Sequence, residues 1–572
     1  MRQWFVAAAF LLAAACGGGG SDSGGGTPGT PGGGGGAPPP ANPTSAEAAR
    51  LLTQATFGPT ATEISAVESA GFASWITAQV ALPLPAQSHE LFLNTRLATL
   101  GTLTANNFYE SWWKQASTEP DQLRQRVAFA LSQIFVVSLH DPAVDPRGAA
   151  SYYDMLARNA LGNYRTLLED VTMHPMMGGY LTYLGNQKED AAGTRTPDEN
   201  YAREVMQLMT IGLYELNPDG TLTLGSGGTA AASYTPADIS GLAKVFTGIS
   251  WYHSSPTATT FFGGNAHTDR SVRPMIFYPQ YHSTSAKTFL GTTIPASATV
   301  DVAGDLRIAL DRLFNHPNVG PFISFRLIQQ LVTSNPSPAY VGRVAAIFNN
   351  NGSGVRGDLA AVVRAVLLDT EARAMSAVGS ASFGKLREPV IRVTNWIRAF
   401  NATSQQGNWL ITSTGANTSL GQSPLTSASV FNFWRPGFVP PASTELGSRS
   451  LLAPEFQIVD EVTSASYINA MQTWVDAGIG STPPGGSGRD VFSAYTAELA
   501  LADTPISLVN RMNTLLFYGQ MSPTLQGRVL AAITAVAIPA TGTQAQIDAA
   551  RLNRVKTAVF FSMIAPEYLV QR

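Results

Sequence analysis

Residues 196–207 read Thr196-Pro197-Asp198-Glu199-Asn200-Tyr201-Ala202-Arg203-Glu204-Val205-Met206-Gln207. Thr196 is a residue type preferred at a helix N-cap, and Pro197 suits the first helical position. Gly212 is a typical helix end, so the sequence predicts an amphipathic helix over 197–211. Helical spacing of apolar residues recurs along the chain, and the predicted fold is therefore mainly α: one large helical domain with long irregular loops and short β-hairpins.

The polar side of the predicted helix concentrates ionic groups. At about 100° per residue, one stripe carries the following residues: Glu199, Asn200, Arg203, Glu204 and Gln207. In a functional interpretation one glutamate is a general acid or base, and Arg203 binds an anion or steadies a developing charge. In a structural interpretation Glu199 completes a capping box with Thr196, and the remaining residues are ordinary (i, i+4) partners.

Further helices are predicted along most of the remaining chain. Thr44 with Glu47 and Thr60 with Glu63 form capping-box patterns that open two of them. The other predicted helices cover 119–138, 149–160, 164–173, 236–246, 301–315, 320–333, 338–350, 357–373, 385–400, 453–470, 505–518 and 548–562. Gly, Thr, Ser and Pro instead fill 217–235, 253–300 and 401–450, which we expect to be loops and hairpins.

Cys16 is the only cysteine of the 572 residues. Before it lie a charged start, a short apolar run and three alanines, a pattern similar to a lipoprotein signal peptide with Cys16 as the lipidated residue. A plain secretory signal with an incidental cysteine is the alternative. We therefore expect a signal peptide over 1–15, a lipidated cysteine with a Gly/Pro/Ser-rich tether over 16–42, and a helical domain over 43–572.

These expectations locate the protein outside the cytoplasm, held to the cell envelope by a lipid. Gly17 after Cys16 resembles lipoproteins of the outer membrane, where the cell has one. No later apolar run reaches the length of about 20 residues that a membrane span needs, so the lipid is the expected membrane anchor.

Composition excludes several classes of protein. Charged residues make up 13% and the formal net charge is −3, so no basic field attracts nucleic acid. With one thiol the chain forms no internal disulfide. It contains no Gly-x-Ser-x-Gly elbow, Walker loop, dinucleotide-binding fingerprint or EF-hand loop. None of the 7 histidines has metal-ligand spacing, so no metal is expected and the cofactor stays unknown.

His282 is the histidine best placed for chemistry. It lies in a polar loop that also carries Lys287. A histidine there can carry a proton near neutral pH, or it can simply cap a neighbouring carbonyl group. His174 and His316 each precede a proline and are expected to close helices.

Several segments, in order, resemble the DUF1800 family, a bacterial family of unknown function. The likeness spans about 44–572 and is carried by 197–204, 207–209, Gly212-Leu213, Ala49-Arg50-Leu51-Leu52, Thr56-Phe57-Gly58-Pro59, Val245-Phe246-Thr247-Gly248, His282 with Lys287-Thr288-Phe289-Leu290-Gly291, His316-Pro317-Asn318-Val319, Lys385-Leu386-Arg387-Glu388-Pro389 and Ala565-Pro566-Glu567-Tyr568. The resemblance implies an exported, mostly helical protein. It also implies a possible partner from a second exported family, DUF1501, which resembles sulfatases and phosphatases.

Two departures from the family pattern affect the expected site. Many members carry Phe-Trp-His-Asn-His-Phe on a helix where this chain has Ser132 and Ile134 in place of the two histidines. If that pair held a metal, this chain has lost the metal site. Relatives also often have Asp after the loop histidine and Gly before the lysine, whereas here Ser283 follows His282 and Ala286 precedes Lys287.

Two functions remain open from the sequence. The first is an exported acid–base hydrolase acting on a cell-surface or extracellular polymer. Its catalytic residues would be Glu199, Arg203, Glu204, His282 and Lys287. The second is a non-catalytic surface binding or assembly protein that works with a DUF1501-like partner. In that case the polar stripe is internal framework, and the loops at 217–235 and 253–300 form the contact surface.

Overall fold

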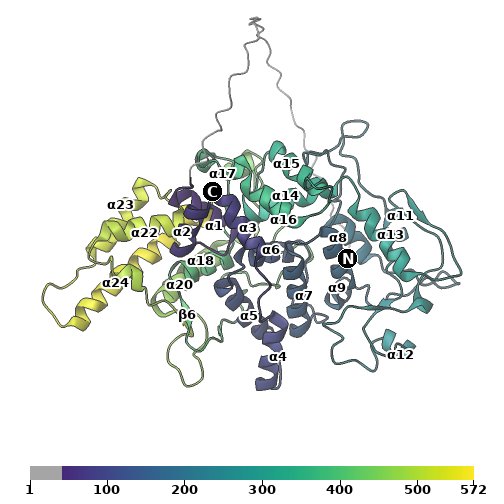
Figure 1. Ribbon diagram of the computed structural model, residues 1–572, viewed down its shortest axis with the longest axis horizontal. Helices are drawn as coiled ribbons and strands as arrows, with labels where there is room; N and C mark the ends of the chain where they lie inside the picture. Colours follow the sequence, from purple (N-terminus) through teal and green to yellow (C-terminus); the bar gives the residue numbers. More distant parts are fainter. Residues whose placement is uncertain (1–41) are drawn as a thin grey trace, which may run out of the picture. The chain divides into compact units, whose positions relative to one another are not determined.

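The computed structural model describes residues 42–572, which form one unit rich in helices (Figure 1). The α-helices are α1 Ser45–Ala55, α2 Ala61–Ala70, α3 Phe72–Ala81, α4 His89–Leu100, α5 Ala105–Thr118, α6 Gln122–Ser132, α7 Pro146–Asn159, α8 Tyr164–Met173, α9 Pro175–Tyr180, α10 Asn200–Gln207, α11 Pro236–Ala243, α12 Ala258–Phe261, α13 Val302–Phe314, α14 Val319–Leu331, α15 Pro338–Asn349, α16 Leu359–Leu368, α17 Thr370–Arg373, α18 Pro389–Ala399, α19 Glu445–Ser448, α20 Glu461–Ala477, α21 Thr496–Leu499, α22 Pro505–Phe517, α23 Pro523–Ala535, α24 Gln544–Met563 and α25 Pro566–Leu569. The predicted mainly α fold class is confirmed.

The remaining regular elements are short. Three 3-10 helices cover η1 Pro279–Tyr281, η2 Met375–Gly379 and η3 Pro454–Ile458. The strands are β1 Ile249–Ser250, β2 Ile276–Phe277, β3 Lys287–Phe289, β4 Thr292–Ile294, β5 Lys385–Leu386, β6 Thr403–Ser404, β7 Val491–Phe492 and β8 Val570–Gln571. They form four antiparallel pairs, β1–β2, β3–β4, β5–β8 and β6–β7. In β5–β8, Lys385 pairs with Gln571, which ties the C-terminal end to the middle of the chain.

Local sequence explains where many helices begin. The Thr44 and Thr60 side chains each accept a hydrogen bond from the backbone N–H of the glutamate three residues on, and each threonine backbone N–H donates to the carboxylate of that glutamate, as the sequence predicted. The long predicted helices 357–373 and 385–400 are shorter than expected. The first divides into α16 and α17, and the second starts at Pro389 after the strand β5.

Two helices are buried along their whole length. Every residue of α6 and of α18 is buried, although both contain arginine and other polar residues. Such helices are surrounded by other elements on all sides, and α6 packs against α1, α3, α5, α7 and α14. At the C-terminal end α22, α23 and α24 pack on one another, and α1 reaches across the chain to pack on α22 (Figure 1). The polar groups of α6 and α18 therefore need partners inside the unit.

Some of the predicted segments lie outside the residues that the structure describes. The signal peptide over 1–15, the lipidated Cys16 and all of the tether except Asn42 lie outside the described residues. Within residues 42–572, no helix is both long enough and apolar enough to cross a bilayer.

Candidate functional site

The helix that carries the polar stripe begins later than predicted. Thr196 is not its N-cap: α10 starts at Asn200, and Glu199 occupies the N-cap position without making a side-chain cap. Asp198 accepts the hydrogen bond from the Asn200 backbone at 2.8 Å, while its own backbone N–H donates to Asn186 Oδ1 at 2.9 Å. The predicted capping box between Thr196 and Glu199 is therefore wrong, because an aspartate held by a distant asparagine starts the helix.

Glu199 and Arg203 form an exposed pair at the start of α10. Arg203 Nη2 lies 3.4 Å from Glu199 Oε2. The Arg203 side chain is 45% exposed and the Glu199 side chain is 41% exposed. Ser240 of α11 also donates a hydrogen bond to Glu199 Oε1 at 2.5 Å. An exposed ion pair of this kind contributes little to stability. Glu199 thus joins α10 to α11 at the surface.

Glu204 differs from Glu199 and Arg203 because it is buried. Its Oε2 has no hydrogen-bond partner among the described residues. Burial raises the pKa of the Glu204 carboxyl, and the nearby Arg203 offsets only part of that shift. A carboxyl with a raised pKa is suited to proton transfer, but Glu204 lines neither of the two cavities described below.

His282 and Lys287 meet at a third residue, Asp305 of α13. His282 Nε2 lies 3.0 Å from Asp305 Oδ2, and Lys287 Nζ lies 2.8 Å from the same oxygen. His282 Nδ1 donates to the carbonyl of Thr247 at 2.7 Å, the geometry of the carbonyl-capping interpretation. The side chains of His282 and Lys287 are almost fully buried. Their contacts with Asp305 connect the loop before β3, and β3 itself, to α13.

The structure does not bring the five predicted residues into one centre. Helix α11 packs against α10 on one side and against β3, which begins with Lys287, on the other. The approach to β3 is so close that a Cβ on Gly241 would lie 1.8 Å from the carbonyl oxygen of Thr288. The catalytic role predicted for Glu199, Arg203, Glu204, His282 and Lys287 stays a prediction, since their geometry joins the first pair and the last pair separately.

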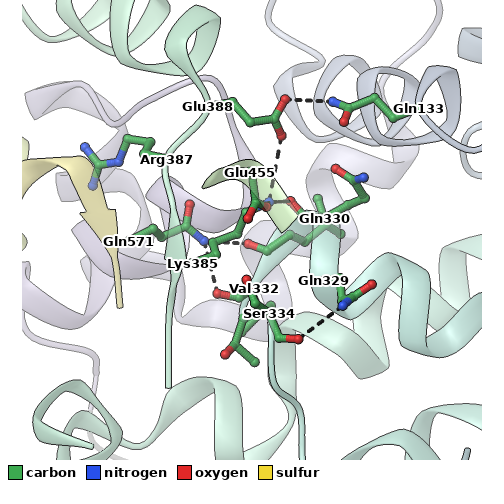
Figure 2. Close-up of polar contacts among 12 residues, drawn as sticks. Gln133, Gln329, Gln330, Val332, Ser334, Lys385, Arg387, Glu388, Glu455 and Gln571 are labelled. Carbon is green, nitrogen blue, oxygen red and sulfur yellow. Dashed lines mark hydrogen bonds and ion pairs between the residues drawn. The ribbon is translucent and has the colours of Figure 1, made fainter. Parts of the chain in front are cut away.

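A more concentrated polar cluster lies where α6, α14, β5 and η3 meet (Figure 2). Lys385 Nζ lies 2.9 Å from Glu455 Oε1 and 3.8 Å from Glu388 Oε1, and it donates to the carbonyl of Gln330 at 3.0 Å. All three ionic side chains are at most 4% exposed. One buried lysine thus serves two buried glutamates, and we call Lys385, Glu388 and Glu455 the ionic cluster.

Amides extend the ionic cluster. Gln133, at the end of α6, donates to Glu388 Oε2 at 2.8 Å, as Figure 2 shows, and Gln422 donates to the same oxygen at 2.9 Å. Asn432 in turn donates to Gln133 Oε1 at 2.9 Å. Segments far apart in the sequence are therefore held by one buried hydrogen-bond network.

Some polar atoms of this region have no partner. Glu455 Oε2, Glu388 Oε1 and Gln330 Oε1 are buried without a hydrogen-bond partner among the described residues. Burial raises the pKa of the Glu455 carboxyl, and Lys385 opposes that shift. Orphaned acceptors beside a raised-pKa carboxyl are expected to contact a water or a ligand group.

Such a space exists beside Glu455. A cavity of about 30 Å³, here called the inner chamber, is lined by Glu455, Gln330, Gln133, Asn432 and Arg326 among others. That volume holds a water molecule or a small polar group. The inner chamber is therefore a space the size of a water molecule, with a mixed polar and apolar lining and an acidic residue in its wall.

A second cavity adjoins the inner chamber. This outer pocket has a volume of about 420 Å³ and is mainly apolar. The two cavities share Leu208, Arg326, Phe431 and Pro436 as lining residues. Leu208 directly follows α10, so the end of the helix that the sequence singled out does border this region, although its glutamates do not.

Sequence reasoning did not assign the ionic cluster a function. Lys385 and Glu388 belong to a segment that carries the family resemblance. Glu455 lies in the predicted helix 453–470, which the structure divides into η3 and α20. Gln133 and Ile134, which line the inner chamber, lie in the segment where relatives often carry histidines. That departure was the one signal in the sequence that pointed to this region.

Within residues 42–572, no group of three or more His, Cys, Asp or Glu side chains is arranged to hold a metal ion. The inner chamber instead presents one carboxylate, amides and arginine.

The family model described as "Protein of unknown function (DUF1800)" matches residues 50–570, and the chain belongs to this family. No curated protein and no solved structure matches the chain.

Proposed function

We propose that the chain is an acid–base hydrolase of the cell envelope whose reaction takes place at the inner chamber. The observation that carries this proposal is the carboxyl of Glu455: it is buried, its pKa is raised, its Oε2 has no hydrogen-bond partner among the described residues, and the residue lines the inner chamber. A perturbed acidic group in a cavity is the usual mark of a proton-transfer site.

In the proposed reaction, Glu455 takes a proton from a water molecule in the inner chamber. The water oxygen attacks the scissile bond of a substrate that enters from the outer pocket, and the proton then passes to the leaving group. Lys385, at 2.9 Å, holds the Glu455 carboxyl in place and adjusts its proton affinity, while Glu388 and its amide donors hold Lys385. The substrate is an extracellular or cell-surface polymer, or a group attached to one.

The test compares Glu455→Gln with the native chain on p-nitrophenyl glycosides, esters, phosphates and sulfates. Removing a positioned general base is expected to lower kcat by about 10²–10⁴-fold, measured at a temperature where circular dichroism shows both chains to be folded. Glu498→Gln is the matched control, because Glu498 is also a buried glutamate in an ion pair, with Arg511. Full activity in Glu455→Gln would contradict the assignment.

A non-catalytic surface protein is the second candidate, and one observation favours it. Residues 213–233 form a narrow arm with paired positions Tyr214–Ala232, Leu216–Leu222 and Leu224–Ala230. On this arm Leu213, Tyr214, Leu222 and Leu224 are all at least 45% exposed. Exposed apolar side chains gathered on one element suit contact with another protein, such as a DUF1501-like exported partner. Lack of any turnover by the native chain would favour this candidate.

For either function we propose that the protein is exported and anchored by a lipid on Cys16, in the outer membrane where the cell has one. The charged start, short apolar run and small residues before Cys16 support this proposal. Replacing Cys16 by Ser is expected to abolish incorporation of labelled palmitate and to release the chain from the membrane fraction. Unchanged membrane association of Cys16→Ser would contradict the lipid anchor.

A further inference from the structure

The outer pocket combines an apolar wall with positive charge. Helix α14 contributes Phe322, Phe325 and Arg326, and the arm at 213–233 contributes leucines. The predicted loop region 401–450 adds Phe431 and Arg435. No aspartate or glutamate lines the pocket, so its only formal charges are two guanidinium groups.

Both guanidinium groups lie against phenylalanine rings and lack a carboxylate partner. Arg326 is 5.1 Å from the ring centre of Phe322, and Arg435 is 5.6 Å from that of Phe431. Burial lowers the pKa of Arg326 to about 10. Arginines elsewhere in the unit illustrate the contrast: Arg398 forms hydrogen bonds of 2.7 Å to both carboxylate oxygens of Glu63.

A guanidinium group held on an aromatic ring keeps its hydrogen-bond donors available for an anion. Arginine binds carboxylate and phosphate groups through two parallel hydrogen bonds, and this is stronger away from bulk water. The leucine and phenylalanine side chains beside it remove an alkyl chain from water. The volume of about 420 Å³ is within the range of pockets that hold small molecules.

We propose that the outer pocket binds an amphiphilic anion, namely an alkyl chain that ends in a carboxylate or phosphate group. The alkyl chain lies against α14 and the arm, and the anionic head contacts Arg326 and Arg435. The inference deepens the proposed function by naming the kind of group that the substrate presents, and as a route to hydrolysis it rests on that function. Binding itself requires neither Glu455 nor turnover.

The test measures binding of alkyl carboxylates by titration calorimetry to the full chain carrying Cys16→Ser, which lacks the acylation site. Octanoate is expected to bind, and each added methylene up to the filled pocket strengthens binding by about three- to fourfold. Octanol and octyltrimethylammonium, which keep the chain without the negative charge, are expected to bind at least about tenfold more weakly. Acetate is expected to show no measurable binding.

Variants separate the pocket from general surface effects. Arg326→Gln combined with Arg435→Gln is expected to weaken octanoate binding by about 10–100-fold. Arg435 is exposed, so Arg435→Gln alone is expected to fold normally and to show part of that loss. Arg528→Gln, at an exposed arginine of α23 outside the pocket, is the control and should bind octanoate like the parent chain.

Three outcomes would overturn the inference. These are equal binding of octanoate and octanol, octanoate binding that is unchanged in the double arginine variant, and binding to phosphatidylglycerol vesicles without binding of octanoate. The last result would indicate a membrane surface contact instead of a pocket. Octanoate binding by Glu455→Gln distinguishes the two proposals, because hydrolysis fails there while pocket binding persists.

Discussion

Replacing Lys385 by Met is expected to lower the free energy of unfolding by about 3–5 kcal/mol at neutral pH. The substitution keeps most of the side-chain volume but leaves Glu388 and Glu455 buried without their shared cation, which lies 3.8 Å and 2.9 Å from them. Breaking a buried ion pair from one side is costly, since the remaining charge cannot return to water. Urea unfolding of the native and variant chains, followed by circular dichroism, measures the difference.

The same substitution at Lys556 is the control for the Lys385 prediction. Lys556 pairs with Asp476 at 2.9 Å, but Asp476 is 72% exposed, so Lys556→Met should cost less than about 1 kcal/mol. The difference in free energy of unfolding between the native chain and Lys385→Met should also become smaller as the pH falls below 5. Without the lysine, which opposes the effect of burial, the pKa of the Glu455 carboxyl stays raised in the folded chain, so its protonation restores part of the lost stability as the pH falls. A deficit equal to that of Lys556→Met, or independent of pH, would mean that the ionic cluster does not stabilise the fold.

Local sequence signals predicted much of the fold because they act over a few residues. The capping boxes at Thr44 and Thr60 are complete within four residues, and both are present as predicted. Asn217 to Gly220, at the start of the predicted loop region 217–235, forms a turn in which the Gly220 N–H donates to the carbonyl of Asn217 at 2.9 Å. The predicted helix 164–173 agrees with α8 at both ends. The mainly α fold class could therefore be predicted from these local signals taken together.

Helix ends that depend on distant residues were not predictable in this way. The start of α10 moved from Pro197 to Asn200 because Asp198 is fixed by Asn186, in a loop before it. α6 ends at Ser132, whereas the apolar spacing that continues to Ile134 predicted a longer helix. Ile134 is buried all the same, because the chain turns and keeps it inside. Apolar spacing reports burial more reliably than it reports the last residue of a helix.

The grouping of residues at the candidate site was even harder to predict from local sequence than the helix ends. Glu199 and Arg203 were predicted to share a face, and they do pair, since four residues of a helix bring them together. The pairing of Glu388 with Gln133 spans 255 residues, and no local pattern encodes it. Asp305, which joins His282 to Lys287, was also missed, because it lies on a separate helix. Residues that meet only through the tertiary fold need coordinates to be grouped.

Acidification from pH 7 to pH 5 is expected to destabilise the fold through three buried histidines. Burial lowers the pKa of His89 to about 3, that of His174 to about 3 and that of His316 to about 4. Each is neutral in the folded chain, whereas its pKa is about 6.5 when unfolded. A depressed folded pKa gives stability that is present above about pH 6.5 and is lost as the pH falls toward the folded pKa. At about 1.36 kcal/mol per pKa unit, each histidine contributes a loss of about 2 kcal/mol by pH 5.

The carboxyl of Asp154 has the opposite effect on stability, because its protonation stabilises the fold as the pH falls. Burial raises the pKa of Asp154 to about 6, although the backbone N–H groups of His89 and Glu90 donate to it at 2.8 Å. A raised folded pKa gives stability that returns as the pH falls through that value, about 1 kcal/mol between pH 7 and pH 5. The histidine losses, about 6 kcal/mol together, exceed this gain, so the net effect of these four groups is destabilising.

Asparagine substitutions isolate the histidine contribution because the Asn side chain can replace the Nδ1 contact without titrating. His89 Nδ1 lies 2.8 Å from Ser111 Oγ, and His174 Nδ1 accepts from the Met176 backbone at the start of α9. The double variant His89→Asn with His174→Asn should therefore lose about 4 kcal/mol less than the native chain between pH 7 and pH 5, as measured by urea unfolding at each pH. His140→Asn, at an exposed position, should keep the native pH dependence. If the double variant lost as much stability as the native chain over this range, the buried histidines would already be charged in the fold, and the acid sensitivity would have to come from the carboxyls alone.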